Sequence, residues 1–537
     1  MRLTPARTLA RTGLLTVLTW MFWVAPSTAA GPGDDPVEVA SGQVCEPLSE
    51  QIDAYKALRA TSLDLRGTLP TMEEYAAVEA DPEMSSDLVD EWLQSDAFAE
   101  RAVRIHRDLL WNNVDDLILV NTRGRLSARG GLYFRGGGQA SRYRILNVEC
   151  NDEPAQYNAD GSFVFTDMPD GSLREGWIWV NPFWAPDTQI KVCGLDAQDA
   201  ATSPTGTDCA TVEGLSDVGC GCGPNMRRCT TTAAERLVRT ALAEEIEHRI
   251  RDVVERDASY LELLTGDKAY FNGPLVHYWK YQTAFPRMAV SPAPIPLERL
   301  PDLEFTDVDT WVAVEMGPQH SGILTSTAYL LRFQTNRARA NRFFNAFVCQ
   351  PFNAPSGGVP VADEAAQTEP DLQVRHGCEY CHALLEPAAS HWGRWGERGA
   401  TYLSPIDHPP FDAECELCAT SGLPCSARCN GSYTVKSLDP KEDAFIGWLK
   451  PYTFRRPEHR VFVEEGPKYL VYSTIVDGRL PMCVARSTAE RFLGRTLDDD
   501  TDEAWLADVA REFVASGYRY RAVVKAVLEH PSYRRVR

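Results

Sequence analysis

Fifteen cysteines constrain the fold of this chain more than any other feature, because they gather in short clusters and none lies before residue 45. Cysteines in such numbers form disulfides in an oxidising compartment, whereas in the cytoplasm they more often bind metals or act in catalysis. The remaining composition is that of a folded chain, since 44% of the 537 residues are hydrophobic and 24% are charged. It excludes a mainly disordered or collagen-like protein, and the length predicts about two to four domains.

The first 30 residues have the layout of a secretory signal peptide. Three arginines precede an apolar run at 14–26, and small residues at 27–30 suit cleavage. The run has 13 residues, whereas a helix that spans a bilayer needs about 20. We therefore predict that residues 1–30 are removed on export, with an uncleaved anchor as the alternative, and that no integral membrane segment remains. The expected location is the periplasm of a Gram-negative bacterium or another extracytoplasmic space.

The charge balance restricts the possible partners. The chain has 54 Lys and Arg against 75 Asp and Glu, a net charge of −21. Such an acidic surface repels phosphate backbones and anionic lipid head groups, so we do not expect nucleic acid as a partner. It suits docking to a basic protein instead.

The composition changes along the chain and predicts a mainly α-helical, multi-module protein, α+β overall, with a cysteine-rich insertion of strands and loops. After the signal peptide, we expect five segments: an N-terminal helical module (31–118), the β/loop insertion (119–230), a second helical module (231–350), a c-type haem-binding segment with a cysteine-stapled loop (351–440), and a C-terminal strand-plus-helix module (441–537).

Local patterns predict the main elements. Thr71 with Glu74, and Thr232 with Glu235, have the spacing of a helix capping box. Apolar periodicity predicts helices over 87–111, 232–254 and 320–349, and two helices over 502–530 that break at Gly517. Period-two alternation predicts strands at 162–165 and 177–180, and within 441–480.

Cys378-Glu379-Tyr380-Cys381-His382 has the C-x-x-C-H spacing of a c-type haem attachment site. The chemistry requires this spacing, because two thiols form thioethers with the two vinyl groups while the next residue presents its imidazole to the iron. Cys378 and Cys381 are therefore the predicted attachment residues of one covalent haem c, and His382 is the predicted proximal ligand.

Two other interpretations of the motif remain open. Cys378 and Cys381 can form a simple disulfide, or they can bind zinc together with Cys415 and Cys418, which also have C-x-x-C spacing. Export to an oxidising space favours haem over zinc.

For the sixth position on the iron, Met482 is the expected ligand. It is the only methionine after the motif, and Met/His ligation raises the reduction potential as an electron carrier requires. His391 and His408 are the alternative ligands. Each of the three residues could instead have an ordinary position in the core or on the surface and bind no iron.

Thirteen cysteines remain beside the motif, so at least one is unpaired or pairs with another chain. Cys415, Cys418, Cys425 and Cys429 have the spacing of a loop with two local disulfides, and an iron–sulfur cluster is the alternative. We expect Cys220 and Cys222 to be structural as well.

Several segments together resemble the planctomycete-type cytochrome c proteins, which are exported multi-module proteins of planctomycetes and myxobacteria. The similar segments are 63–71, 88–101, 263–272, 321–325, 341–349, 494–495 and 513–518, in the family's order. The resemblance implies a mainly helical fold, one c-type haem and a disulfide between Cys349 and Cys483. The chain departs from the family after the motif, where Glu386-Pro387 is not followed by the family's Gly-Phe.

Three functions compete. The first is extracytoplasmic electron transfer with an unknown redox partner protein, suggested by the haem motif, the acidic surface and the methionine. The second is a haem-dependent oxidoreductase, either a peroxidase or a dehydrogenase. The third is a disulfide-stapled surface-binding protein whose haem is structural or absent. Catalytic motifs such as H-E-x-x-H and G-x-G-x-x-G are missing, so the sequence assigns no catalytic residue and no substrate.

Overall fold

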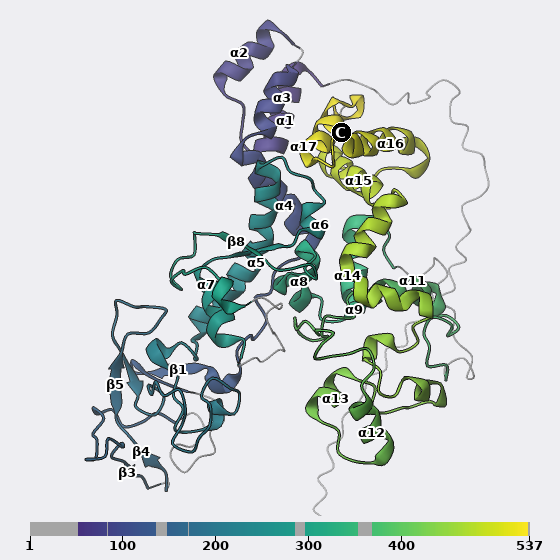
Figure 1. The fold of residues 1–537 in the computed structure, drawn as a ribbon. Coiled ribbons are helices and arrows are strands. Elements are labelled where there is room, and N and C mark those ends of the chain that lie inside the picture. Colours follow the sequence, from purple (N-terminus) through teal and green to yellow (C-terminus); the bar gives the residue numbers. More distant parts are fainter. Residues whose placement is uncertain are drawn as a thin grey trace, which may run out of the picture. The chain divides into compact units, whose positions relative to one another are not determined.

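Helices are the main secondary structure of the computed structural model, which describes residues 52–82, 84–135, 148–169, 171–284, 296–352 and 368–534. The predicted signal peptide and Cys45 lie outside the described residues. Within the described part of the chain, no helix is long and apolar enough to cross a membrane. The strands are short and helices predominate over them, so the expected α+β fold is confirmed (Figure 1). The contacts join residues 51–537 into one unit, and the module boundaries stay predictions.

The first four helices form the N-terminal part of the core. They are α1 (Ala54–Arg66), α2 (Met72–Ala80), α3 (Ser86–Leu93) and α4 (Asp96–Leu110). The predicted capping box is present, because the Thr71 hydroxyl accepts from the Glu74 amide and the Glu74 carboxylate accepts from the Thr71 amide. The predicted helix over 87–111 is two helices, because Ser95 interrupts the first and caps the second through the amide of Phe98.

Helix α5 (Thr232–Glu255) packs against α4 and begins one residue away from the predicted cap. The hydroxyl of Thr231, not of Thr232, accepts from the amide of Ala234. Glu235 does not complete a capping box. Its buried carboxylate accepts from the Leu119 amide at 2.6 Å and pairs with Arg125 at 3.1 Å. The sequence pattern was misleading because Glu235 is used to join α5 to the start of the insertion.

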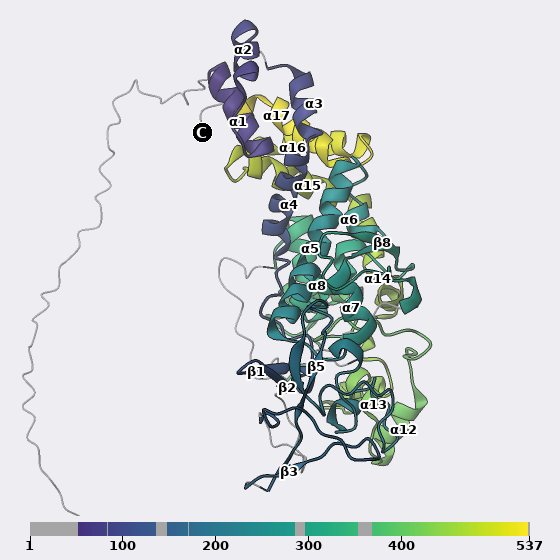
Figure 2. The ribbon, with the colours of Figure 1, turned by 90° about the vertical axis from the view of Figure 1, so that its left-hand side faces the viewer.

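The cysteine-rich insertion contains a four-stranded sheet in the order β1-β2-β6-β5. The strands β1 (Leu126–Arg129), β2 (Leu132–Arg135) and β5 (Trp177–Val180) lie together in Figure 2, and β6 (Ile190–Cys193) runs parallel to β2. The short strands β3 (Thr166–Asp167) and β4 (Leu173–Arg174) pair separately. The strand at 177–180 is confirmed. The one at 162–165 is wrong, because this segment makes only an isolated bridge between Tyr157 and Phe163.

Three disulfides hold the insertion together. They join Cys150 to Cys193, Cys209 to Cys220, and Cys222 to Cys229. The structural role expected for Cys220 and Cys222 is therefore confirmed. All six cysteines are almost fully buried, so the disulfides replace part of the apolar core that such short strands cannot supply.

The chain between the insertion and the haem motif folds into short elements. They are α6 (Glu262–Thr265), β7 (Lys268–Phe271), α7 (Gly273–His277), β8 (Val312–Glu315), α8 (Thr327–Arg332) and α9 (Asn336–Phe343), followed by a π-helical turn at Phe344–Val348. The predicted helix over 320–349 is thus broken at Phe333, and it ends at Cys349 as expected.

The predicted strands within 441–480 are wrong. Residues after 456 form α14 (Pro457–Val476), which begins with a proline whose fixed φ suits the first helical turn. Gly466 has φ +71 and divides α14 into two halves. The first half is so short that its apolar residues within 460–463 alternate as they would in a strand. Only packing distinguishes a helix from a strand here.

The C-terminal helices are α15 (Arg479–Leu493), α16 (Asp499–Ala515) and α17 (Tyr520–Glu529). The predicted break at Gly517 is confirmed, with φ +80. Cys349 and Cys483 form the expected disulfide, which ties the π-helical turn to α15. Trp92, Phe98 and Tyr520 belong to one continuous hydrophobic core, so the two ends of the described chain are packed together.

Candidate haem-attachment site

The haem motif lies where helix α11 (Glu379–Ser390) begins. Cys378 is the N-cap residue, and its carbonyl accepts from the amide of His382 at 3.0 Å. Helix α11 lies beside α9 and α14 (Figure 1). Leu385, Ala389 and Trp392 attach it and the turn after it to the core. The two thiols and the imidazole are thus presented by the first turn of a firmly packed helix.

Cys378 and Cys381 are half-buried and have free thiols. Among the described residues, they are the only cysteines outside disulfides. The simple disulfide that competed with haem attachment is therefore not formed in this structure.

The cysteine-stapled loop after the motif contains α12 (Ala413–Ser421) and α13 (Ala427–Ser432). Cys415 pairs with Cys429 and Cys418 pairs with Cys425, so the two predicted local disulfides are confirmed. A zinc or iron–sulfur site needs thiolates, and these four sulfur atoms are already bonded to one another.

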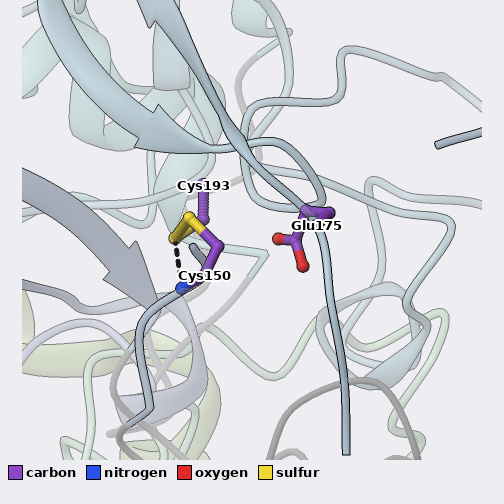
Figure 3. A group of neighbouring side chains, drawn as sticks. All are labelled: Cys150, Glu175 and Cys193. Atoms are coloured by element: carbon purple, nitrogen blue, oxygen red, sulfur yellow. Dashed lines mark hydrogen bonds between the residues drawn. A yellow bond between two sulfur atoms is a disulfide. The ribbon is translucent and has the colours of Figure 1, made fainter. Parts of the chain in front are cut away.

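Among the described residues, two groups of three side chains have donor atoms close enough to hold a metal, but both include a disulfide. Figure 3 shows Cys150 and Cys193 joined through sulfur beside Glu175, with the Cys150 amide donating to the Cys193 sulfur at 3.1 Å. The second group is Asp412 with the Cys415–Cys429 pair. Because sulfur in a disulfide is not a thiolate ligand, both groups are structural.

His382 is held by a carboxylate that the sequence analysis did not assign. Its Nδ1 lies 2.7 Å from Oε1 of Glu386, one helical turn further along α11. The Glu386 side chain is only 6% exposed. It also accepts from Arg337 Nε at 2.5 Å and from Arg455 Nη2 at 3.1 Å. A donor role for Nδ1 leaves Nε2 of the neutral ring as the metal-binding nitrogen.

The environment of Glu386 keeps it ionised. Burial on its own raises the pKa of this carboxyl group, but the hydrogen bond and charge of Arg337, the hydrogen bond from His382 and the charge of Arg455 outweigh it and hold the pKa below its usual value. The i, i+4 spacing from His382 was the available sequence signal for this residue. Arg337 and Arg455 come from other elements, and no sequence pattern linked them to Glu386.

A large cavity borders the second half of α11, and Cys378, Cys381 and His382 are not among the residues on its wall. Its volume is about 990 Å³, and residues on its wall include Arg337, Glu386, Ala389, His408, Phe454 and Arg455. His382 lies four residues before Glu386 and seven before Ala389, and these spacings place all three on one helix face. Cofactor pockets commonly have about 300–1,000 Å³. A second cavity, beside α5 and β7, has only about 30 Å³, which is room for little more than water.

The three candidates for the sixth ligand lie in different surroundings. Met482 is on α15, packs against the core and does not line the large cavity. His391 is buried, its Nδ1 bonds to the carbonyl of Gly466 at 2.9 Å, and burial lowers its pKa to about 4. His408 lines the cavity, and its Nδ1 is buried without a hydrogen-bond partner among the described residues.

Comparison with known proteins gives one family match, over residues 40–124. The match is to PSCyt2, a protein of unknown function (DUF1549). It covers α1–α4 and agrees with the resemblance of the opening segment to the planctomycete-type cytochrome proteins. The haem motif lies outside it. No curated protein and no solved structure matches the chain.

Proposed function

We propose that the chain is an exported c-type cytochrome-like haem protein that acts in extracytoplasmic electron transfer. The observation that carries the proposal is the arrangement at the start of α11. Two free thiols and an imidazole follow one another in its first turn, and His382 lies on the helix face whose Glu386 and Ala389 line a cavity of about 990 Å³.

The residues at the start of α11 fit a covalent haem. Cys378 and Cys381 would form the thioethers, and His382 would bind the iron through Nε2 while Glu386 fixes the orientation of its ring. Arg337 and Arg455 together bring two positive charges to the single carboxylate of Glu386. Bound haem supplies reversible one-electron chemistry, and the protein supplies attachment, orientation and exclusion of water.

The position of His408 supports it as the sixth ligand. It is the only one of the three candidates that lines the cavity, and an imidazole nitrogen without a partner is costly unless a ligand uses the ring. The carbonyl of His408 accepts from Arg394, which fixes its backbone. Met482 remains the alternative from the sequence. The spectrum of the ferric protein distinguishes His408 from Met482, because methionine ligation gives a near-infrared charge-transfer band. If Met482 is the ligand, Met482→Leu would remove this band and His408→Gln would leave it.

The acidic composition supports a basic redox partner. A net charge of −21 favours long-range attraction to a positively charged protein, and the attraction weakens as salt is added. It also keeps nucleic acid out of the list of expected partners. A periplasmic or other extracytoplasmic location is consistent with the six disulfides of the described residues.

The experiment that tests this function is stopped-flow reduction of a basic mono-haem cytochrome by the reduced full-length holoprotein. Electron transfer predicts fast exchange that slows as ionic strength rises. The competing oxidoreductase predicts slow exchange together with cyanide binding at low concentration and peroxide turnover. The surface-binding protein predicts neither, and deletion of residues 119–230 would then abolish binding to cells.

A further inference from the structure

The partner of the His382 ring is a buried, negatively charged group. A neutral carbonyl is a weaker acceptor than a carboxylate, and a charge-assisted hydrogen bond is roughly twice as strong as a neutral one. Burial strengthens it again, because few water molecules compete for the donor. The Nδ1···Oε1 distance of 2.7 Å is that of such a bond.

We propose that Glu386 lowers the reduction potential of the haem through His382. The inference rests on the proposed function, and Glu386 acts here as a positioning and tuning residue, since it does not itself touch the iron. A strong acceptor at Nδ1 draws the ring proton toward oxygen and increases the electron density at Nε2. A more electron-rich ligand stabilises Fe(III) relative to Fe(II), which lowers the potential.

The surroundings of Glu386 are built to keep this contact in place. His382 and Glu386 lie on the same helix, so the rigid backbone of α11 fixes their separation. The second oxygen, Oε2, accepts from Arg455, whose side chain is only 9% exposed. Arg337 bonds to the same oxygen as His382, and it is 52% exposed. Arg455 therefore anchors the carboxylate from the interior and Arg337 from the surface.

The reaction is one-electron exchange, Fe(III) + e⁻ → Fe(II). The ring proton stays between Nδ1 of His382 and Glu386, so the effect of Glu386 appears in the potential of this exchange.

The test is a potentiometric titration of full-length holoprotein, comparing the wild type with Glu386→Gln and Glu379→Gln. Glu379 is the matched control: it lies on the same helix and loses the same charge, but its carboxylate pairs with His376 and not with His382. Glu386→Gln should favour Fe(II) by about tenfold, which is a positive shift of about 59 mV for one electron. Glu379→Gln should shift the potential by much less. Equal shifts in the two variants would overturn the proposal.

A second variant decides the question if Glu386→Gln does not fold or does not retain haem. Glu386→Asp keeps the negative charge but shortens the side chain by one methylene group, so it weakens the hydrogen bond to Nδ1 of His382. The potential should become more positive although the local charge is unchanged. A negative or absent shift would contradict the proposal. Wild-type protein without covalent haem would refute the proposed function itself, and this outcome is distinct from haem that is bound but insensitive to Glu386.

Discussion

The disulfide between Cys349 and Cys483 should be worth more to stability than any other in the second half of the chain. It closes a loop of 134 residues and joins the end of the π-helical turn to α15. In the chain-entropy model, a loop of this length contributes about 5 kcal/mol at 25 °C. The Cys418–Cys425 disulfide closes a loop of 7 residues, for which the same relation gives about 2.4 kcal/mol.

The assay compares urea unfolding of Cys349→Ala/Cys483→Ala with that of Cys418→Ala/Cys425→Ala, followed by tryptophan fluorescence and far-ultraviolet circular dichroism. Each variant loses two sulfur atoms, so the pairs differ mainly in loop length. The long-loop variant should lose about 2–3 kcal/mol more than the short-loop variant. Equal losses, or a larger loss in the short-loop variant, would refute the reasoning that these cysteines act by closing the loop.

Three further outcomes follow from the structure. Arg339→Met should destabilise the protein by about 3–5 kcal/mol in the same urea assay. The fully buried guanidinium donates to the carbonyls of Trp395, Gly396 and Gly399, and these carbonyls would lose their partner. A loss below about 1 kcal/mol would show that the loop at 395–399 finds other donors. Burial lowers the pKa of His106 to about 4, below its unfolded value of about 6.5, so only the unfolded chain takes up this proton as the pH falls from about 6.5 to 4. The free energy of unfolding should therefore decrease over that range, by up to about 3 kcal/mol from this residue. His106→Gln should make this dependence on pH less steep. Treatment with EDTA should leave the circular dichroism of the stapled loop at 415–429 unchanged, because disulfides hold it; loss of structure on chelation would favour the zinc interpretation.

Features that depend on neighbouring residues could be predicted from the sequence. The capping box at Thr71, the two disulfides within 415–429 and the break at Gly517 each rest on a few adjacent positions. The Cys349–Cys483 disulfide joins distant positions, and only the resemblance to a known family indicated it.

Features that depend on packing could not be predicted. The segment 460–463 alternates like a strand, yet Pro457 and the contacts of α14 make it helical. Glu386 stands four residues from His382, but its importance comes from Arg337 and Arg455, which are 49 and 69 residues away in the chain. The large cavity gathers residues from several segments, so no single stretch of sequence indicated it.

The central claim is that Cys378 and Cys381 attach one haem covalently. The most direct measurement is a pyridine haemochrome spectrum of the full chain, exported from a host that matures c-type cytochromes, beside a Cys378→Ala/Cys381→Ala variant. The account predicts one haem with a c-type spectrum per wild-type chain, retained after acid–acetone extraction, and none in the variant. Wild-type protein that is folded and exported but has no covalent haem would contradict it.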